Sequence, residues 1–285
     1  YAYDDWSLAQ MAKAMGKTDV AATFSKRAAN WRHAWDPKTG FMRARLSDGA
    51  FREPFDPEAA GYGSDYTEGN AWQYSWYVPQ DVAGLIGAMG GDAKFVAKLD
   101  ALFEAKVDPS HFKHVEDITG LIGWYAHGNE PSHHIAYLYD YAGAPWKTQQ
   151  RLKQIMDSQY APRPDGLSGN DDLGQMSAWY VFTALGFYPV TPGSDEYAIG
   201  RPFVSRAAIH LDHGRTFTIT ASPLDDAHPY VGAVTLNGKP LQRTYLRHGE
   251  IVAGGELHFT MQAEPNREWG RAATDRAAAM SHYGG

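Results

Sequence analysis

The spacing of apolar residues changes once along the chain, and this change limits the folds that it can adopt. Up to about residue 190, apolar residues recur three and four positions apart, as in helices with one buried face. After Gly200, short segments rich in β-branched residues alternate apolar and polar positions and are separated by turns. The dipeptide Asn237-Gly238 favours a hairpin between two of them. The sequence therefore predicts a mainly α protein that ends in a β module.

The predicted elements follow from these two spacings and from the turns between them. Helices are expected at 6–16, 20–35, 68–77, 80–89, 92–105, 118–127, 132–142, 146–157 and 174–185. Strands are expected at 207–211, 216–222, 232–241 and 256–262. The short turns between helices favour antiparallel helix pairs. Residues 37–66 are rich in Gly, Pro and Asp, and a loop of this length is expected to be functional.

Composition excludes several classes of function. The net charge of −7 and the pI of about 5.9 do not favour binding to nucleic acid or to an anionic membrane. No run of eighteen apolar residues predicts a transmembrane helix. Cysteine is absent, which excludes disulfides and thiolate chemistry within the chain. Nine Trp and seventeen Tyr exceed the needs of a core and point to a surface that stacks on a ligand.

The segment YTEGNAWQYSW, residues 66–76, places a carboxylate among aromatic side chains. If it is helical, Glu68, Trp72 and Trp76 lie four residues apart on one face. A general acid must stay protonated near neutral pH, which a partly dry pocket beside these rings favours. Alternatively, the tryptophans belong to the core and Glu68 only complements a helix N-terminus. The pattern alone leaves both interpretations open.

The segment HGNEPSHH, residues 127–134, offers a second group of polar side chains. Its proline suits the first turn of a helix, which places Asn129 and Glu130 at the helix entrance. They are predicted either to cap this helix or to supply oxygen ligands to a hard cation. Its histidines, His133 among them, lack the HxxxH spacing of a zinc site.

Two further segments carry acids. GLSGNDDLGQMSAWY, residues 166–180, leads from Gly-rich chain through Asn170 and Asp172 into a helix, where acids also serve as ordinary dipole complements. SHFKHVED, residues 110–117, adds a fourth polar cluster. Neither matches an EF-hand loop, and the chain has no nucleophile elbow, P-loop or dinucleotide fingerprint. Separated carboxylates and aromatic platforms together suggest glycoside hydrolysis.

Three long segments carry a resemblance to a known family. Residues 66–86, 117–149 and 166–202 resemble glycoside hydrolase family 92, whose members are calcium-dependent, inverting exo-α-mannosidases. The resemblance implies part of an (α/α)6 barrel followed by C-terminal β-strands, with ranges of 1–195 for the barrel, 196–270 for the β module and 271–285 for a tail. It also implies a location in the periplasm or outside the cell.

The resemblance assigns roles residue by residue. Glu68 resembles the general acid and Asp172 the general base, with Asn170 in place of a second aspartate found in some relatives. For Ca²⁺, the expected ligands are Glu130 and Glu116. The residues expected to contact the mannose-containing glycan are Trp72, His111, Asn129 and His133.

The chain departs from the family in two respects. Relatives that cleave α-1,2 links carry a His-Glu pair where this chain has His111 and Phe112, so α-1,3, α-1,4 and α-1,6 links are open too. The chain is also short, and it begins without Met or a signal-peptide pattern. We therefore expect a C-terminal portion with exposed apolar surface, whose partner is the N-terminal β-sandwich of the complete enzyme. The alternatives are a non-catalytic carbohydrate-binding fragment and another (α/α)6 enzyme such as a lyase.

Overall fold

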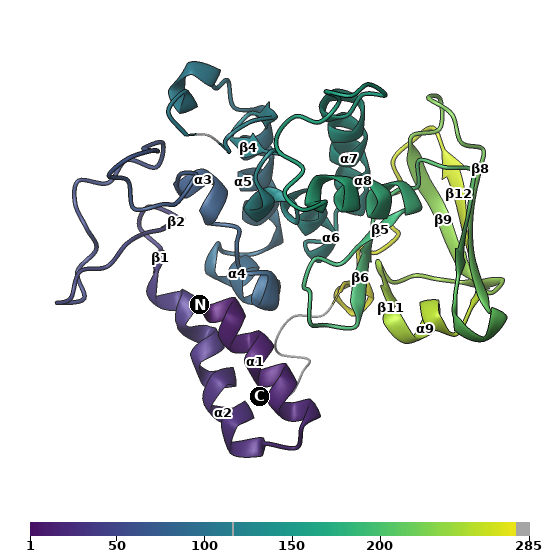
Figure 1. Ribbon diagram of the computed structural model, residues 1–285, viewed down its shortest axis with the longest axis horizontal. Coiled ribbons are helices and arrows are strands. Elements are labelled where there is room, and N and C mark those ends of the chain that lie inside the picture. Colours follow the sequence, from purple (N-terminus) through teal and green to yellow (C-terminus); the bar gives the residue numbers. More distant parts are fainter. Residues whose placement is uncertain (116, 278–285) are drawn as a thin grey trace. The chain divides into compact units, whose positions relative to one another are not determined.

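The computed structural model describes residues 1–115 and 117–277, and their contacts divide them into two compact units. The first is Tyr1–His133 and the second includes His134–Ala277 (Figure 1). Both contain helices and strands, so the mixed composition predicted from the two spacings is confirmed. The predicted domain ranges stay predictions. In the described part of the chain, no helix has the length and apolar character needed to cross a membrane.

The first unit begins with a helical hairpin. α1 (Ala2–Ala14) packs against α2 (Thr18–Arg27), and Gly16, with a φ of 68°, lies in the turn between them (Figure 1). α1 begins before the predicted start at residue 6, so Asp4 and Asp5 lie in its first turn, where they complement the helix dipole. Asp5 also pairs with Arg27 of α2 at 3.0 Å.

The predicted helices at 80–89 and 92–105 are confirmed as α4 (Val82–Ala88) and α5 (Asp92–Glu104). The other elements of this unit are η1 (Ala28–His33), β1 (Trp35–Asp36), β2 (Phe41–Met42), α3 (Ala71–Tyr74), η2 (Pro79–Asp81), η3 (Pro109–Phe112), β3 (Leu121–Ile122), β4 (Tyr125–Ala126) and η4 (Glu130–Ser132).

The predicted helix at 68–77 is wrong in its extent, because α3 begins only at Ala71. Asn70 is its N-cap, and its side chain accepts hydrogen bonds from the backbone amides of Trp72 and Gln73. The Gln73 side chain accepts from the Asn70 amide at 2.8 Å, which completes a capping box. Glu68 therefore lies outside the helix and does not share a helical face with the tryptophans.

The predicted helix at 118–127 is wrong, because this segment forms the hairpin of β3 and β4. Gly120 and Gly123 both have positive φ, of 61° and 62°, which interrupts a helix. A Cβ on Gly123 would lie 2.2 Å from the carbonyl oxygen of Leu102, so only glycine fits against the end of α5. The spacing of apolar residues indicates neither the positive φ values nor the close packing at Gly123.

In the second unit, α7 (Pro145–Gln159) and α8 (Gln175–Leu185) confirm two predicted helices. The predicted helix at 132–142 is interrupted, because a 3-10 turn, η5 (Ile135–Tyr137), precedes the short helix α6 (Leu138–Tyr141). α8 is followed by Gly186, whose φ of 95° is the left-handed conformation common after a helix.

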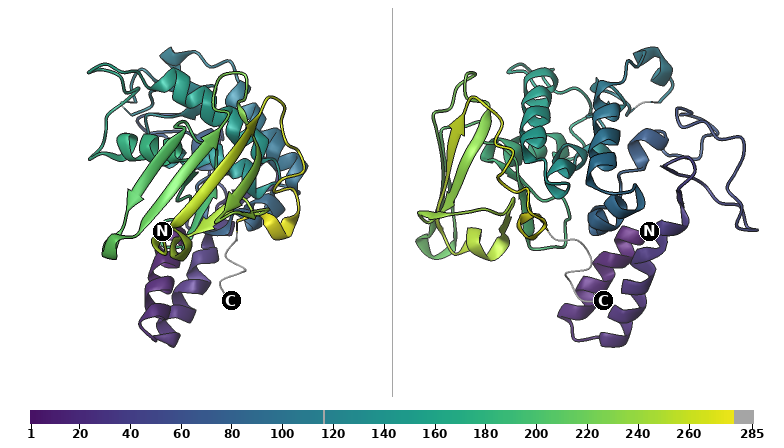
Figure 2. Two further views of the ribbon diagram at one scale, coloured as in Figure 1. Left: turned by 90° about the vertical axis from the view of Figure 1, so that its right-hand side faces the viewer. Right: turned by 180° about the vertical axis from the view of Figure 1, so that it is seen from behind.

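Two sheets complete the second unit. The larger has the order β10-β9-β12-β8-β7, in which β12 runs parallel to β8 and the other neighbours are antiparallel (Figure 2, left). Its strands are β7 (Arg206–His210), β8 (Thr216–Ser222), β9 (Tyr230–Leu236), β10 (Lys239–Pro240) and β12 (Gly255–Gln262). The smaller sheet, β11-β6-β5, comprises β5 (Phe187–Tyr188), β6 (Glu196–Ile199) and β11 (Tyr245–Arg247). The short elements are η6 (Asp212–Gly214), α9 (His248–Val252) and η7 (Ala273–Asp275).

The predicted alternation of strand residues is confirmed by burial. Along β8, Phe217, Ile219 and Ala221 are buried in one apolar cluster to which both sheets contribute. The predicted hairpin is also present between β9 and β10, where Asn237 and Gly238 have φ values of 52° and 74°. Gln149 of α7 accepts a hydrogen bond from the Val231 amide at 2.9 Å, which joins helix and sheet.

Asp140 of α6 is fully buried. Within the described chain, neither carboxyl oxygen makes a hydrogen bond of normal geometry. Burial raises the pKa of Asp140 well above its ordinary value, and the nearby Thr148 hydroxyl offsets only part of this effect. The folded protein therefore keeps this carboxyl protonated at pH values where the unfolded chain ionises it.

We predict that Asp140→Asn removes a pH-dependent loss of stability. Because the unfolded state releases the proton first, the free energy of unfolding should fall by about 1.4 kcal/mol per pH unit between the ordinary aspartate pKa and the raised pKa of the folded state. Urea denaturation of both proteins between pH 4 and 7 should show that the free energy of unfolding of the variant increases relative to that of the wild type as the pH rises. The matched control is Asp212→Asn, since Asp212 is exposed. Parallel pH profiles for all three proteins would contradict the prediction.

Candidate functional site

A hollow of about 400 Å³ lies in the first unit and contains Glu68. Two segments of the chain form it, one from the long loop and one before the β3–β4 hairpin. The lining residues are Gly61, Tyr62, Gly63, Tyr66, Thr67, Glu68, His114, Val115 and Asp117. Carboxylates beside tyrosine rings suit the hydroxyls and the apolar ring face of a sugar. The long loop was predicted to be functional, and these contacts place part of it at the hollow.

Glu68 has a backbone conformation that few residues other than glycine adopt. Its φ is 51°, in the left-handed region, and its side chain is exposed. The described residues therefore do not form the partly dry pocket of the general-acid interpretation, which the pattern had left open beside the structural one. The carbonyl of Glu68 accepts a hydrogen bond from the Asn129 side chain at 2.8 Å. The Tyr74 hydroxyl donates to the carbonyl of Thr67, so both peptides are held by side chains.

The charge of Glu68 acts on a neighbouring phenol. Burial raises the pKa of Tyr74, and the negative charge of Glu68 raises it further. Tyr74 therefore stays protonated near neutral pH and can keep donating its hydrogen bond.

Trp72 was predicted to contact substrate, and it is packed among other rings. Its ring lies parallel to Trp124, with centroids 6.4 Å apart and an interplanar angle of 6°. Phe41 meets Trp72 edge-on at 5.0 Å, and the Lys98 ammonium lies 5.3 Å from its centroid. Burial lowers the pKa of Lys98 to about 8. Trp72 is not one of the residues that line the hollow, and its contact with substrate stays a prediction.

Asp172 lies in the second unit, in the loop before α8. Asp172, Leu173 and Gly174 have consecutive left-handed φ values of 44°, 55° and 94°. The neighbouring Asp171 takes the structural role, because its carboxylate accepts from the amide and the hydroxyl of Ser177, both at 2.9 Å. The dipole-complement interpretation thus fits Asp171, and Asp172 is left exposed.

The two predicted catalytic acids share their unusual backbone. In the described chain, five residues other than glycine have positive φ: Glu68, Asp172, Leu173, His213 and Asn237. Such conformations cost about 1–3 kcal/mol each and gather at functional sites, where surrounding contacts maintain them. Glu68 and Asp172 are the two carboxylates among these five residues.

The other predicted site residues occupy varied surroundings. His111 of η3 is exposed, and its Nε2 donates to the Glu58 carbonyl at 2.6 Å. His133 is buried, and its Nε2 donates to the His127 carbonyl at 2.9 Å. Burial lowers the pKa of His127 well below its ordinary value, and the proximity of His133 lowers it further.

The structure also describes three further predicted site residues: Asn129, Glu130 and Asn170. Asn129 is buried at the N-cap of η4, but its side chain bonds to Glu68 and does not cap the turn. Glu130 is half-buried in the first turn of η4, and Asn170 is exposed. Glu116 lies outside the described residues. Over 1–115 and 117–277, no three His, Asp or Glu side chains gather closely enough to form a metal site.

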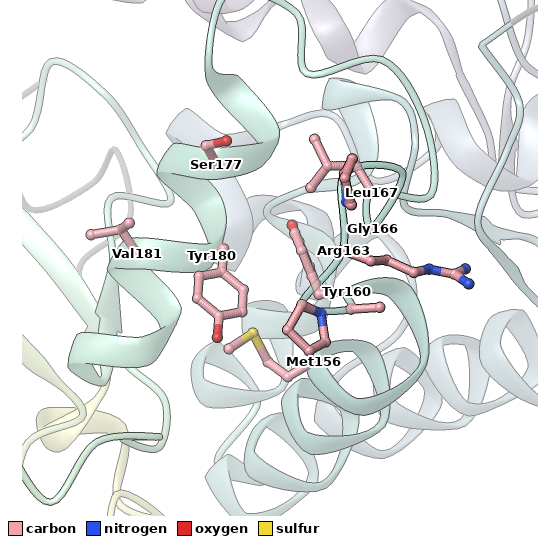
Figure 3. Close-up of a pocket in the computed structure, with 11 residues that line it drawn as sticks. Met156, Tyr160, Arg163, Gly166, Leu167, Ser177, Tyr180 and Val181 are labelled. Carbon is pink, nitrogen blue, oxygen red and sulfur yellow. The ribbon is translucent and has the colours of Figure 1, made fainter.

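A second hollow, of about 510 Å³, lies within the second unit between the end of α7 and α8 (Figure 3). Tyr160 stacks on Trp179 with centroids 5.9 Å apart, and its hydroxyl donates to the Met176 carbonyl. Tyr180 and Ser177 of α8 also line this hollow, and Ser177 is the residue that Asp171 binds. It therefore adjoins the loop that carries Asp172.

The sequence reasoning left several lining residues without a role. Tyr62 and Tyr66 lie in the long loop, and His114 and Asp117 lie in the polar cluster SHFKHVED. The length of the loop and the density of polar residues in the cluster indicated that these segments are functional. Neither feature indicates which of their side chains line the hollow with Glu68.

The sequence matches the profile of the glycosyl hydrolase family 92 catalytic domain over residues 1–263. The chain therefore belongs to this family, and the resemblance seen in its three motifs is confirmed at that level.

Solved structures of relatives are similar along almost the whole chain. The family 92 α-mannosidase BT3965 of Bacteroides thetaiotaomicron, solved in complex with mannoimidazole, is 41% identical with a TM-score of 0.92. The inverting mannosidase BT2199 of the same species is 39% identical with a TM-score of 0.87. An uncharacterized secreted glycosidase of Arthroderma benhamiae is 29% identical over 299 residues.

The match covers nearly all of this chain but a minor share of each relative. It includes 98% of this chain and 37% of BT3965, and 99% of this chain and 39% of BT2199. For the Arthroderma protein the shares are 96% and 36%. The chain thus spans little more than a third of these relatives.

Proposed function

We propose that the intact protein is an inverting exo-α-mannosidase in which Glu68 is the general acid and Asp172 the general base. The observation that carries the proposal is the shared backbone geometry of these two carboxylates, each held left-handed at the family's motif positions. Family membership and the names of two relatives, an α-mannosidase and an inverting mannosidase, support the reaction class.

The proposed reaction needs one proton donor and one proton acceptor. Glu68 donates its proton to the glycosidic oxygen as the bond from C1 to that oxygen breaks. Asp172 takes a proton from a water molecule whose oxygen forms the new bond to C1 from the opposite face. Afterwards Glu68 is ionised and Asp172 is protonated, and exchange with solvent restores both. The exposure of both carboxylates in this chain is compatible with that exchange.

We also propose a calcium ion near Glu130, with Glu116 as a further ligand. The chemistry of the donors fits a hard cation, because both are carboxylates, Glu130 is half-buried in the first turn of η4, and the chain has no thiols. When bound, the ion would polarise sugar hydroxyls and favour distortion of the ring.

The leaving sugar is proposed to be held without a carboxylate at position 112. Phe112 is 2% exposed and packs edge-on against Trp124 at 5.8 Å, so it belongs to the core. The histidine beside it, His111, is exposed and remains the candidate contact. This arrangement is compatible with α-1,3, α-1,4 and α-1,6 links as well as α-1,2.

The architecture of the intact protein is part of the same proposal. We propose that the helices belong to a partial (α/α)6 barrel and that an N-terminal β-sandwich accompanies it. The exposed apolar residues in and just after α1 (Leu8, Met11 and Met15) and in the α8 region (Leu173 and Val181) support the presence of further chain that covers them. A periplasmic or extracellular location is supported by the secreted relative.

We predict that Glu68→Gln in the intact protein lowers kcat on mannobioses by about 10²–10⁴-fold, because acid assistance is lost. Mannosides with an activated leaving group, such as 2,4-dinitrophenyl α-mannoside, should lose much less. The control Glu264→Gln changes an exposed glutamate of the β module and should leave both rates intact. Equal losses on both substrates would remove Glu68 from the role of acid.

Removing calcium should lower both activity and stability. We expect a chelator to abolish mannose release and Ca²⁺ to restore it better than Mg²⁺. Because a bound ligand stabilises the folded state, Ca²⁺ at about 100 times its Kd should add about 2.7 kcal/mol to the free energy of unfolding. Glu130→Gln should weaken this stabilisation, measured by thermal unfolding over a calcium titration. An unchanged titration in the variant would exclude Glu130 as a ligand.

A further inference from the structure

We propose that Asn129 is a positioning residue that fixes the backbone of Glu68 and thereby aims its carboxyl group. The inference rests on the proposed role of Glu68 as general acid. It differs from the predicted role of Asn129 as a substrate contact, because the partner is a peptide carbonyl of the protein itself.

The hydrogen bond between them has one possible polarity. The Nδ2 of Asn129 lies 2.8 Å from the carbonyl oxygen of Glu68, and only the amide NH₂ can donate to a carbonyl. Asn129 is 3% exposed, so water cannot readily replace a lost partner. An unsatisfied buried donor costs about 1–3 kcal/mol. This single bond therefore favours the backbone conformation in which the Glu68 carbonyl faces Asn129.

The chain on either side of Glu68 is already fixed, which leaves its own peptide as the adjustable point. Before it, the Thr67 carbonyl accepts from Tyr74. After it, a Cβ on Gly69 would lie 2.9 Å from the Gln73 side chain, and the Asn70 amide donates to that same side chain. The left-handed φ of 51° at Glu68 then needs a partner for its carbonyl, and Asn129 supplies it.

The loop that carries Asn129 is itself rigidly built. A Cβ on Gly128 would lie 1.9 Å from the Thr119 hydroxyl, and the Gly128 amide donates to the Thr119 carbonyl at 3.1 Å. The His127 carbonyl accepts from His133, and the His127 ring is 2.8 Å from the Tyr125 hydroxyl. These contacts fix the backbone directly before Asn129, whose side chain donates to the Glu68 carbonyl.

The discriminating substitution is Asn129→Asp, which keeps the shape but replaces the donor by an acceptor. Two oxygens cannot share this bond, so the Glu68 peptide should turn and move the carboxyl group. A displacement of about 1 Å can cost on the order of 10²-fold in rate. We expect kcat on mannobioses to fall about 10–100-fold with little change in KM, and less on 2,4-dinitrophenyl α-mannoside.

The matched control is Asn266→Asp. Asn266 makes the same type of bond, from Nδ2 to the Gly232 carbonyl at 2.7 Å, in the β module of the second unit. It should lower the melting temperature and leave kcat unchanged. If Asn129→Asp does not fold, Asn129→Ala removes the donor without adding charge and serves the same comparison.

A double-mutant cycle separates the possible roles. If Asn129 acts through Glu68, then Asn129→Asp should cause no further loss in the Glu68→Gln background. A full additional loss there, or a loss confined to KM, would identify a direct substrate contact and overturn the inference. If Glu68→Gln alone leaves activity intact, the proposed function fails instead.

A measurement without substrate completes the test. With ¹⁵N-labelled glutamate, the Glu68 amide signal is assigned by its loss in Glu68→Gln. We expect Asn129→Asp to shift this signal and to change its HN–Hα coupling, while Asn266→Asp does neither. An unmoved Glu68 signal in a folded Asn129→Asp protein would contradict the proposal.

Discussion

The surroundings of the candidate acid depend on the hydrogen bonds of one buried amide, Asn70. Its Oδ1 caps α3 through two backbone amides, and its Nδ2 donates to the Glu58 carbonyl in the long loop. Gln73, its partner in the capping box, donates in turn to the Trp124 carbonyl of the β3–β4 hairpin at 2.9 Å. Asn70 and its partner Gln73 thus join loop, helix and hairpin. Glu68 precedes Asn70 by two positions, and its location follows from these bonds.

The second carboxylate shows the same division between structural and chemical roles. Asp171 satisfies Ser177 in the first turn of α8, and Asp172 beside it makes a left-handed turn that leaves its side chain exposed. In each unit a polar residue within two positions of the proposed catalytic carboxylate makes the structural bonds: Asn70 near Glu68 and Asp171 beside Asp172. A carboxylate that binds its own helix could not also exchange protons with a substrate and solvent.

Periodicity predicted the long elements well and the short ones poorly. The helices at 92–105, 146–157 and 174–185 bury apolar faces over several turns, so their spacing is informative. The helices predicted at 68–77 and 118–127 failed, because the cap at Asn70 and the packing of Gly123 against Leu102 decide those backbones. The candidate acids were found by motif. Their left-handed backbone was not predictable, since the contact that holds Glu68 comes from Asn129, far along the chain.

The central claim is that Glu68 and Asp172 serve as acid and base in a single displacement. Proton NMR of the sugar first released from an α-linked mannobiose by the intact protein tests it most directly. Attack by water from the opposite face predicts β-mannose as the initial product, which then equilibrates by mutarotation. Initial release of α-mannose would mean retention through a covalent intermediate, and Asp172 would then have to be a nucleophile, which contradicts this account.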